Sequence, residues 1–159
     1  MNLMLAMILA AAGTFGGGTA KITSASTYYD RKNGFACFTG HVFVDDEKYK
    51  IHADRAYVFM NGTNELHRIV ALGNVAITNE TKRAYGAKAS YYRNPGMVVL
   101  YADTKQVAEV RDETERGNQI VRGRKIKFWT DSEQVEVLEA ELSAPSDGSM
   151  DGVKKMFGR

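Results

Sequence analysis

Cysteine and proline are scarce in this sequence, and its charges nearly cancel. Of 159 residues, one is cysteine and two are proline, and the formal net charge is +2. The single cysteine, Cys37, excludes an intrachain disulfide and gives no cysteine-based zinc site. So small a net charge does not indicate a nucleic-acid partner. We expect one folded domain, since the length suits one, and no nucleic acid bound to it.

Motifs that carry catalysis are also missing. His41, His52 and His67 lie in separate segments without the spacing of metal ligands. The stretch "GTFGGGTA" follows no strand and opens no helix, so it does not fit a dinucleotide-binding turn. "YGAKASYY" is not the serine turn of a lipase. We therefore expect neither an enzyme nor a metal or cofactor site.

The chain has no apolar run long enough to cross a bilayer. Its longest run, from Leu3 to Ala12, is shorter than the roughly 20 residues that a spanning helix needs. Small residues follow this run, as they do before the cleavage site of a secretory signal, although no basic segment precedes it. We interpret residues 1–20 as a signal-peptide-like segment and expect export. The missing basic segment is explained by a start codon assigned too late, by a weak signal, or by the alternative that this segment is a short apolar strand.

Alternation of apolar and polar residues dominates the remainder, and no window has the spacing of an amphipathic helix. In "FTGHVFV" Phe38, Val42 and Val44 share one side, and in "YKIHA" Tyr49, Ile51 and Ala53 do. The same rule assigns one side to Val75 and Ile77, to Tyr85, Ala87, Ala89 and Tyr91, to Met97, Val99 and Tyr101, and to Ile120, Ile126 and Phe128. This pattern predicts half-buried strands throughout and an all-β fold.

Polar stretches rich in turn residues separate the expected strands. They are "DRKNG" at 30–34, "MNGTN" at 60–64, "RNPG" at 93–96 and "ERGN" at 115–118. Neither proline interrupts a strand, because Pro95 lies in a turn and Pro145 in the polar end of the chain. We expect one β domain over residues 21–142, without a linker, and a loose tail over 143–159.

One pattern occurs twice. Gly40 and Gly73 each open a Gly-x-Val-x-[Val/Ile] strand, which a polar turn and an alanine-centred strand follow, "HADRAY" in one copy and "GAKASY" in the other. Each copy reads as a long hairpin. A third, degenerate copy runs from "VVLYADTKQVAEV" to "IVRGRKIKFWTDSEQVEVLEA" and has lost the leading glycine. Stacked hairpins bury their shared face only against neighbours, which predicts an elongated sheet structure.

Two features raise the question of a ligand. The basic stretch "RGRKIK" is most simply a solvated strand, but alternation places Arg122 and Arg124 on the side of Ile126 and Phe128, where they could meet an anionic head group. The eight tyrosines, seven phenylalanines and one tryptophan fill a core or line a groove. An elongated two-sheet shell can stay open between its sheets and admit acyl chains.

From about Ile22 to Leu142 the sequence resembles the LptA/OstA family of periplasmic lipopolysaccharide-transport proteins. The resemblance rests on "FTGHVFVDDEKYKIHADRAYVF", "LGNVAI", "VVLYADTKQV" and "VRGRKIKFW". His41 stands where the family usually has asparagine. The resemblance implies an OstA-like β-jelly roll, in which two V-facing antiparallel sheets built from repeated hairpins hold the acyl chains of lipopolysaccharide between them. An LptC-like partner or the N-terminal module of the outer-membrane translocon would share this fold.

The resemblance also implies the site and the partners. The groove residues would be Ile22, Val42, Val44, Ile51, Val75, Ile77, Tyr91, Val99, Tyr101, Ile126 and Phe128, with Arg122 and Arg124 as candidate head-group contacts. The partners would be lipopolysaccharide, the inner-membrane and outer-membrane components of the transport machine, and further copies of the chain joined head to tail through terminal strands in the periplasm. The rival interpretation is a structural β-repeat that self-assembles and carries nothing.

Overall fold

Residues 21–46, 49–62, 66–114, 117–129 and 134–143 are described by a computed structural model. In these ranges the chain forms twelve strands, which belong to one antiparallel sheet. The strands are β1 (Lys21–Thr23), β2 (Ser26–Asp30), β3 (Phe35–Asp46), β4 (Tyr49–Met60), β5 (Leu66–Thr78), β6 (Lys82–Tyr92), β7 (Met97–Tyr101), β8 (Ala108–Thr114), β9 (Gly117–Gly123), β10 (Lys125–Trp129), β11 (Val135–Leu138) and β12 (Glu141–Ser143). None of the described residues forms a helix that could cross a membrane.

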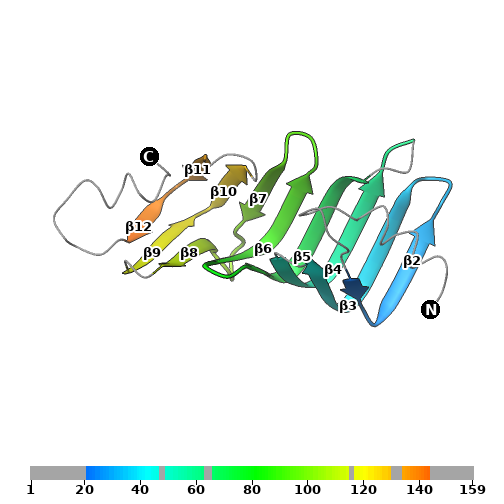
Figure 1. The fold of residues 1–159 in the computed structure, drawn as a ribbon, viewed down its shortest axis with the longest axis horizontal. Coiled ribbons are helices and arrows are strands. Elements are labelled where there is room, and N and C mark those ends of the chain that lie inside the picture. The colour runs from blue at the N-terminus through cyan, green and yellow to red at the C-terminus, as the bar shows by residue number, and fades with distance from the viewer. Residues whose placement is uncertain (1–20, 47–48, 63–65, 115–116, 130–133, 144–159) are drawn as a thin grey trace.

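The pairing is that of a meander of long, bent strands. β3, β4, β5 and β6 are continuous, whereas β1 and β2 both pair with β3, and β7 and β8 both pair with β6. β7 then pairs with β10, and β10 with β11. In the same way β8 pairs with β9, and β9 with β12. β7 and β8 thus act as one interrupted long strand, and so do β9 and β10. Counted in this way, each long strand pairs with the long strand before it in the chain, and the strands lie side by side along the long axis of the molecule (Figure 1).

Every long strand bends at the same level, and we call this line the crease. In the continuous strands the register shifts there, between Thr39 and Val42 in the β3–β4 pair and between Leu72 and Val75 in the β5–β6 pair. The first leaf comprises β2, residues 35–39, 55–60, 66–72 and 88–92, β7, β10 and β11. The second leaf comprises β1, residues 42–46, 49–53, 75–78 and 82–86, β8, β9 and β12. The crease therefore divides one sheet into two leaves.

The repeated glycines explain the crease. Gly40 and Gly73 have φ of 82° and 77°, and the next residues, His41 and Asn74, both have φ of 47°. Two consecutive residues in the left-handed region turn a strand sharply, and glycine and asparagine adopt that region at the lowest cost. Space demands glycine as well, because a Cβ on Gly73 would overlap the carboxylate of Asp54. The Gly-x-Val repeat of the sequence therefore encodes the bend.

The two leaves pack face to face. One cluster of buried apolar residues near the β1–β2 end joins Phe38 and Val58 of the first leaf to Ile22 and Val42 of the second. A second cluster, toward the β11–β12 end, contains Leu100 and Ile126 of the first leaf and Val75, Ala84, Ala108 and Val121 of the second. The core is therefore the space between the leaves of one folded sheet.

The expected hairpins are confirmed by β3–β4 and β5–β6, and the degenerate third copy forms the broken strands β7–β8 and β9–β10. The first and last strands lie at the two ends of the sheet. Residues 1–20 and 144–159 lie outside the described residues, so the signal-peptide-like segment and the tail stay predictions.

Substitution at the crease should be costly. We expect Gly73→Ala to lower the free energy of unfolding by about 2 kcal/mol, because alanine is strained at this φ and its Cβ meets Asp54. Urea denaturation measures the change. The matched control is Gly62→Ala, whose Cβ meets nothing within 4 Å, and it should shift stability by no more than about 0.5 kcal/mol. Equal effects of the two substitutions would refute the role assigned to Gly73.

Candidate functional site

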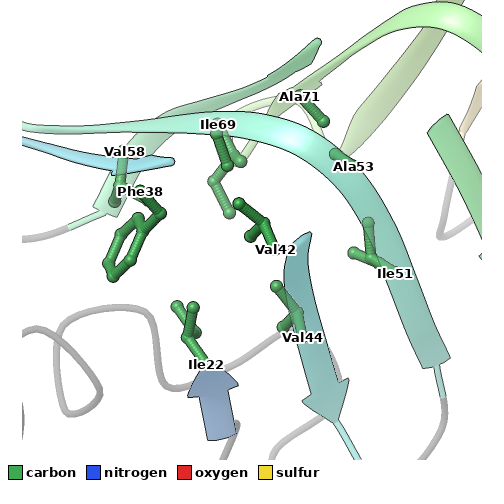
Figure 2. Close-up of a pocket in the computed structure, with 10 residues that line it drawn as sticks. Ile22, Phe38, Val42, Val44, Ile51, Ala53, Val58, Ile69 and Ala71 are labelled. Atoms are coloured by element: carbon green, nitrogen blue, oxygen red, sulfur yellow. The ribbon is translucent and has the colours of Figure 1, made fainter. Parts of the chain in front are cut away.

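A cavity lies between the leaves at the β1–β2 end. Ten residues line it, and all are apolar: Ile22, Phe38, Val42, Val44, Ile51, Ala53, Ala56, Val58, Ile69 and Ala71. Figure 2 shows Ile22 of β1 and both Phe38 and Val44 of β3 pointing into this common space. The cavity measures about 30 Å³, which is room for about one water molecule. With this lining the site can take up hydrocarbon, and it offers no group for acid–base chemistry.

The other half of the interior contains a cluster of fully buried apolar residues. Val75, Leu100, Ala108 and Ile126 are each 0% exposed. Phe128, with Val135 and Val137 of β11, packs against this cluster as a partly buried neighbour. The interior is therefore apolar along its length, with a cavity near β1 and a packed apolar cluster toward β10 and β11.

Most of the predicted groove residues lie in this interior. Ile22, Val42, Val44 and Ile51 line the cavity. Val75, Ile77, Ile126 and Phe128 belong to or pack against the second cluster, and Tyr91 packs against the first.

Val99 and Tyr101 are corrections to the sequence-based assignment. In β7 the residues that join the interior are Val98, paired with Tyr91, and Leu100, paired with Ala89. Val99 and Tyr101 therefore point to the outer face. The run "VVL" is apolar at every position, so alternation alone could not decide which side of this strand faces inward.

Arg122 and Arg124 are a second correction, since neither continues the apolar side of Ile126. The crease passes between β9 and β10 at Gly123, which interrupts the alternation on which the expectation rested. Arg122 lies on the opposite side of β9 from buried Val121, and Arg124 pairs with Glu139 at 3.3 Å. Both guanidinium groups thus lie outside the interior.

Arg122 belongs to an ion cluster on the outer face of the second leaf. Its partner Glu109 is 6% exposed, and the Glu109 carboxylate accepts hydrogen bonds from Arg122 and Arg111. Burial alone would raise the pKa of Glu109, but the two guanidinium groups outweigh burial and hold that pKa below its ordinary value. The carboxylate is therefore ionised and satisfied, as a structural ion cluster requires.

Sequence reasoning missed several cavity residues. Ala56 and Ala71 are direct partners across β4 and β5, and Phe38 is the partner of Ala56 on the other side. Two small residues beside a large one leave hollow space, but this becomes visible only once the strand register is known. Among the described residues, no group of three His, Cys, Asp or Glu side chains could hold a metal ion.

An unclosed antiparallel sheet folded into two leaves around an apolar interior is a β-jelly roll of the kind expected from the sequence. The chain belongs to the LptA/(LptD N-terminal domain) LPS transport protein family, whose model matches residues 21–134. Among solved structures it is similar to LptH of Pseudomonas aeruginosa, described as the LptA homologous periplasmic component of the conserved lipopolysaccharide transport device. The TM-score is 0.67 at 17% identity, over 78% of this chain and 93% of that one. No curated protein sequence matches the chain.

Neutralising Glu109 should expose its contribution to stability. At pH 7 we expect Glu109→Gln to cost about 1–2 kcal/mol, because Arg111 and Arg122 lose a charged acceptor but remain partly solvated. Because the folded-state pKa is lowered, the contribution is complete above the ordinary glutamate pKa of about 4.3 and is lost as the pH falls through the lowered value. Thermal unfolding of the parent protein and of Glu109→Gln from pH 7 to 3 should therefore show that their difference in stability shrinks as the pH falls. A stability difference independent of pH would contradict the role assigned to the Glu109 carboxylate.

Proposed function

We propose that this protein is a periplasmic lipopolysaccharide carrier that forms part of a bridge from the inner to the outer membrane. The acyl chains of the lipid would lie between the leaves, against the groove residues that face inward. The observation that carries the proposal is the wholly apolar lining of the cavity between β1, β3, β4 and β5. Family membership supports it, because the family is one of lipopolysaccharide-transport proteins.

Partition supplies the physical mechanism. Each methylene group that leaves water for an apolar interior gains roughly 0.8 kcal/mol. Several buried methylenes hold a lipid, yet the lipid can leave when the next interior offers equivalent surface. Such transfer has no direction of its own, so direction must come from an energy-coupled component elsewhere in the machine.

Binding requires the leaves to separate. A cavity of about 30 Å³ is far smaller than an acyl chain, so the interior must widen about the crease. The half near β1 and β2 is the favourable place to open, because it is already hollow and its lining includes Ala53, Ala56 and Ala71, which fill little space. Uptake would therefore begin near β1 and β2.

The free edges supply the means of joining copies. β2 and β1 end the two leaves at one side, and β11 and β12 end them at the other. The N–H of Trp129 donates to the Gln134 carbonyl at 3.3 Å, in the register that pairs Lys127 with Glu136. Hydrogen-bonded and non-hydrogen-bonded pairs alternate along an antiparallel ladder, so Lys127 and Glu136 form a hydrogen-bonded pair and Ile126 and Val137 do not. The N–H of Val137 therefore points away from β10. That donor is available to a strand of another copy.

A purely structural β-repeat is the second candidate. It would use the same free edges and carry no lipid. Membership of a transport family does not favour it, and capture of lipid by the interior separates the two.

Lipid capture should depend on which face of a strand carries the probe. A photo-crosslinking residue at Val44 should capture lipopolysaccharide, because Val44 lines the cavity. Its neighbour Phe43 is the control, since this ring points to the outer face and lies 4.6 Å from the ring of His52. Gel mobility and immunodetection of the adduct measure the yield. Equal capture at both positions would exclude the interior as the binding site.

Joining of copies should depend on the outward N–H groups of β11. Val137→Pro should reduce the rise of average mass with protein concentration seen by light scattering, because it removes a donor at the free edge. Glu136→Pro is the comparison, since it removes a donor to β10 and should instead lower stability. A parent protein that stays monomeric at high concentration would exclude self-association.

A further inference from the structure

The outer faces of the two leaves differ in what surrounds their cations. On the first leaf the outward residues form three rows that run across the strands. The row nearest the crease contains Arg55, Leu72, Lys88, Tyr101 and Lys125, each the Cα partner of the next. Exposed Leu138 follows Lys125 at the end of this row. Cations thus alternate with apolar and aromatic side chains.

Aromatic rings, rather than carboxylates, contact three cations of this face, Arg68, Lys88 and Lys125. Lys88 and Lys125 place their ammonium groups 5.0 and 5.4 Å from the centre of the same ring, that of Tyr101. Arg68 lies 5.2 Å from the ring of Tyr92, and its Nε is buried without a hydrogen-bond partner. A cation–π contact leaves the positive charge unneutralised, so these groups remain able to attract an anion.

Carboxylates are confined to the edges of this face. In the three outward rows, as far as the structure describes them, the carboxylates are Asp30 in β2 and Glu136 in β11. Asp30 accepts hydrogen bonds from Asn33, and Glu136 pairs with Lys127 at 2.9 Å. The centre of the face is therefore positive and aromatic.

The outer face of the second leaf has the opposite arrangement. Arg83 pairs with Glu113 at 3.2 Å, and Glu109 accepts from Arg111 and Arg122. Positive charge on this leaf is thus largely neutralised by carboxylates within the same face.

The floor of the positive face contains a polar group that the fold leaves unsatisfied. Ser90 is 0% exposed, points outward between Val70 and Val99, and its Oγ has no hydrogen-bond partner. A buried hydroxyl without a partner costs free energy, and native structures rarely retain one without a reason. Arg68 and Lys88 are close to Ser90 in the sheet, so an anionic oxygen entering between them could satisfy the hydroxyl.

We propose that the outer face of the first leaf docks on an anionic membrane surface, with lipid phosphates against Lys88 and Lys125 and with Tyr101 and Leu138 at the level of the head groups. Charge complementarity selects this occupant: basic side chains attract anionic lipids, and tyrosine and aliphatic side chains favour the boundary between head groups and acyl chains. The ion-paired second leaf then faces water. This surface is separate from the interior and does not depend on lipid carriage.

Vesicle flotation tests the docking. The full-length protein should float with vesicles that contain phosphatidylglycerol and stay behind with pure phosphatidylcholine. Lys88→Gln/Lys125→Gln should weaken binding on the order of tenfold or more, since each basic residue near an anionic surface contributes substantially. Lys88→Arg/Lys125→Arg should retain vesicle binding, because it keeps both positive charges.

The matched control removes equal charge from the second leaf. Lys50→Gln/Arg83→Gln should leave vesicle binding within about twofold of the parent, because these side chains lie on the other outer face. Equal loss in the two double variants, or equal binding to neutral vesicles, would overturn the proposal. Circular dichroism confirms that each variant is folded.

Two further measurements separate docking from other anion or lipid binding. Uptake of a fluorescent acyl probe by the interior should be unchanged in Lys88→Gln/Lys125→Gln; a parallel loss of uptake would mean that flotation reports the interior, and would overturn the proposal. Inorganic phosphate should displace vesicles no better than chloride at equal ionic strength. Selective displacement by phosphate would indicate a single-anion pocket and refute docking on a surface.

Discussion

The alignment of the bends is the constraint on which the remaining structure depends. A long strand that turned one residue early or late would lose its register with both neighbours, so every strand must bend at the crease. At Gly73 this requires a left-handed backbone, a second left-handed residue at Asn74, and no side chain against Asp54, while Asn74 Nδ2 donates to Asp54 Oδ2 at 2.9 Å. The crease turns one face of the sheet inward, which creates the apolar interior, and leaves the other face outward on both leaves.

Local patterns were sufficient to predict the hairpins. Gly40 and Gly73 mark equivalent points in two copies, and the turn stretches lie between strands. The position of the crease was not predicted, because a repeated glycine before an alternating strand reads equally well as the start of that strand. Residues on either side of an unrecognised bend are then compared as if they belonged to one straight strand. That is why Arg122 was assigned to the side of Ile126, although Gly123 separates them.

The interior was predictable where one side of a strand is polar, and unpredictable where both sides are apolar. Ile51 and Ala53 alternate with Lys50, His52 and Asp54, and both line the cavity. Val98, Val99 and Leu100 give no such contrast, and their sides depend on the pairing of β7 with β6 and β10. The aromatic partners of the cations could not be predicted from the sequence either. Lys88 and Lys125 both contact the ring of Tyr101 because of the register of β6, β7 and β10.

The meander has a consequence for how the chain acquires its structure during synthesis. Each long strand pairs with the strand that precedes it, so no pairing waits for a distant part of the chain. Contacts between neighbouring segments close small loops, which keeps the entropic cost of each addition low. The sheet can therefore grow one strand at a time as the chain emerges, with β3 and β4 already paired before β9 has appeared. Until β11 and β12 arrive, the last strand in place is always a growing edge, ready for the next segment of the same chain.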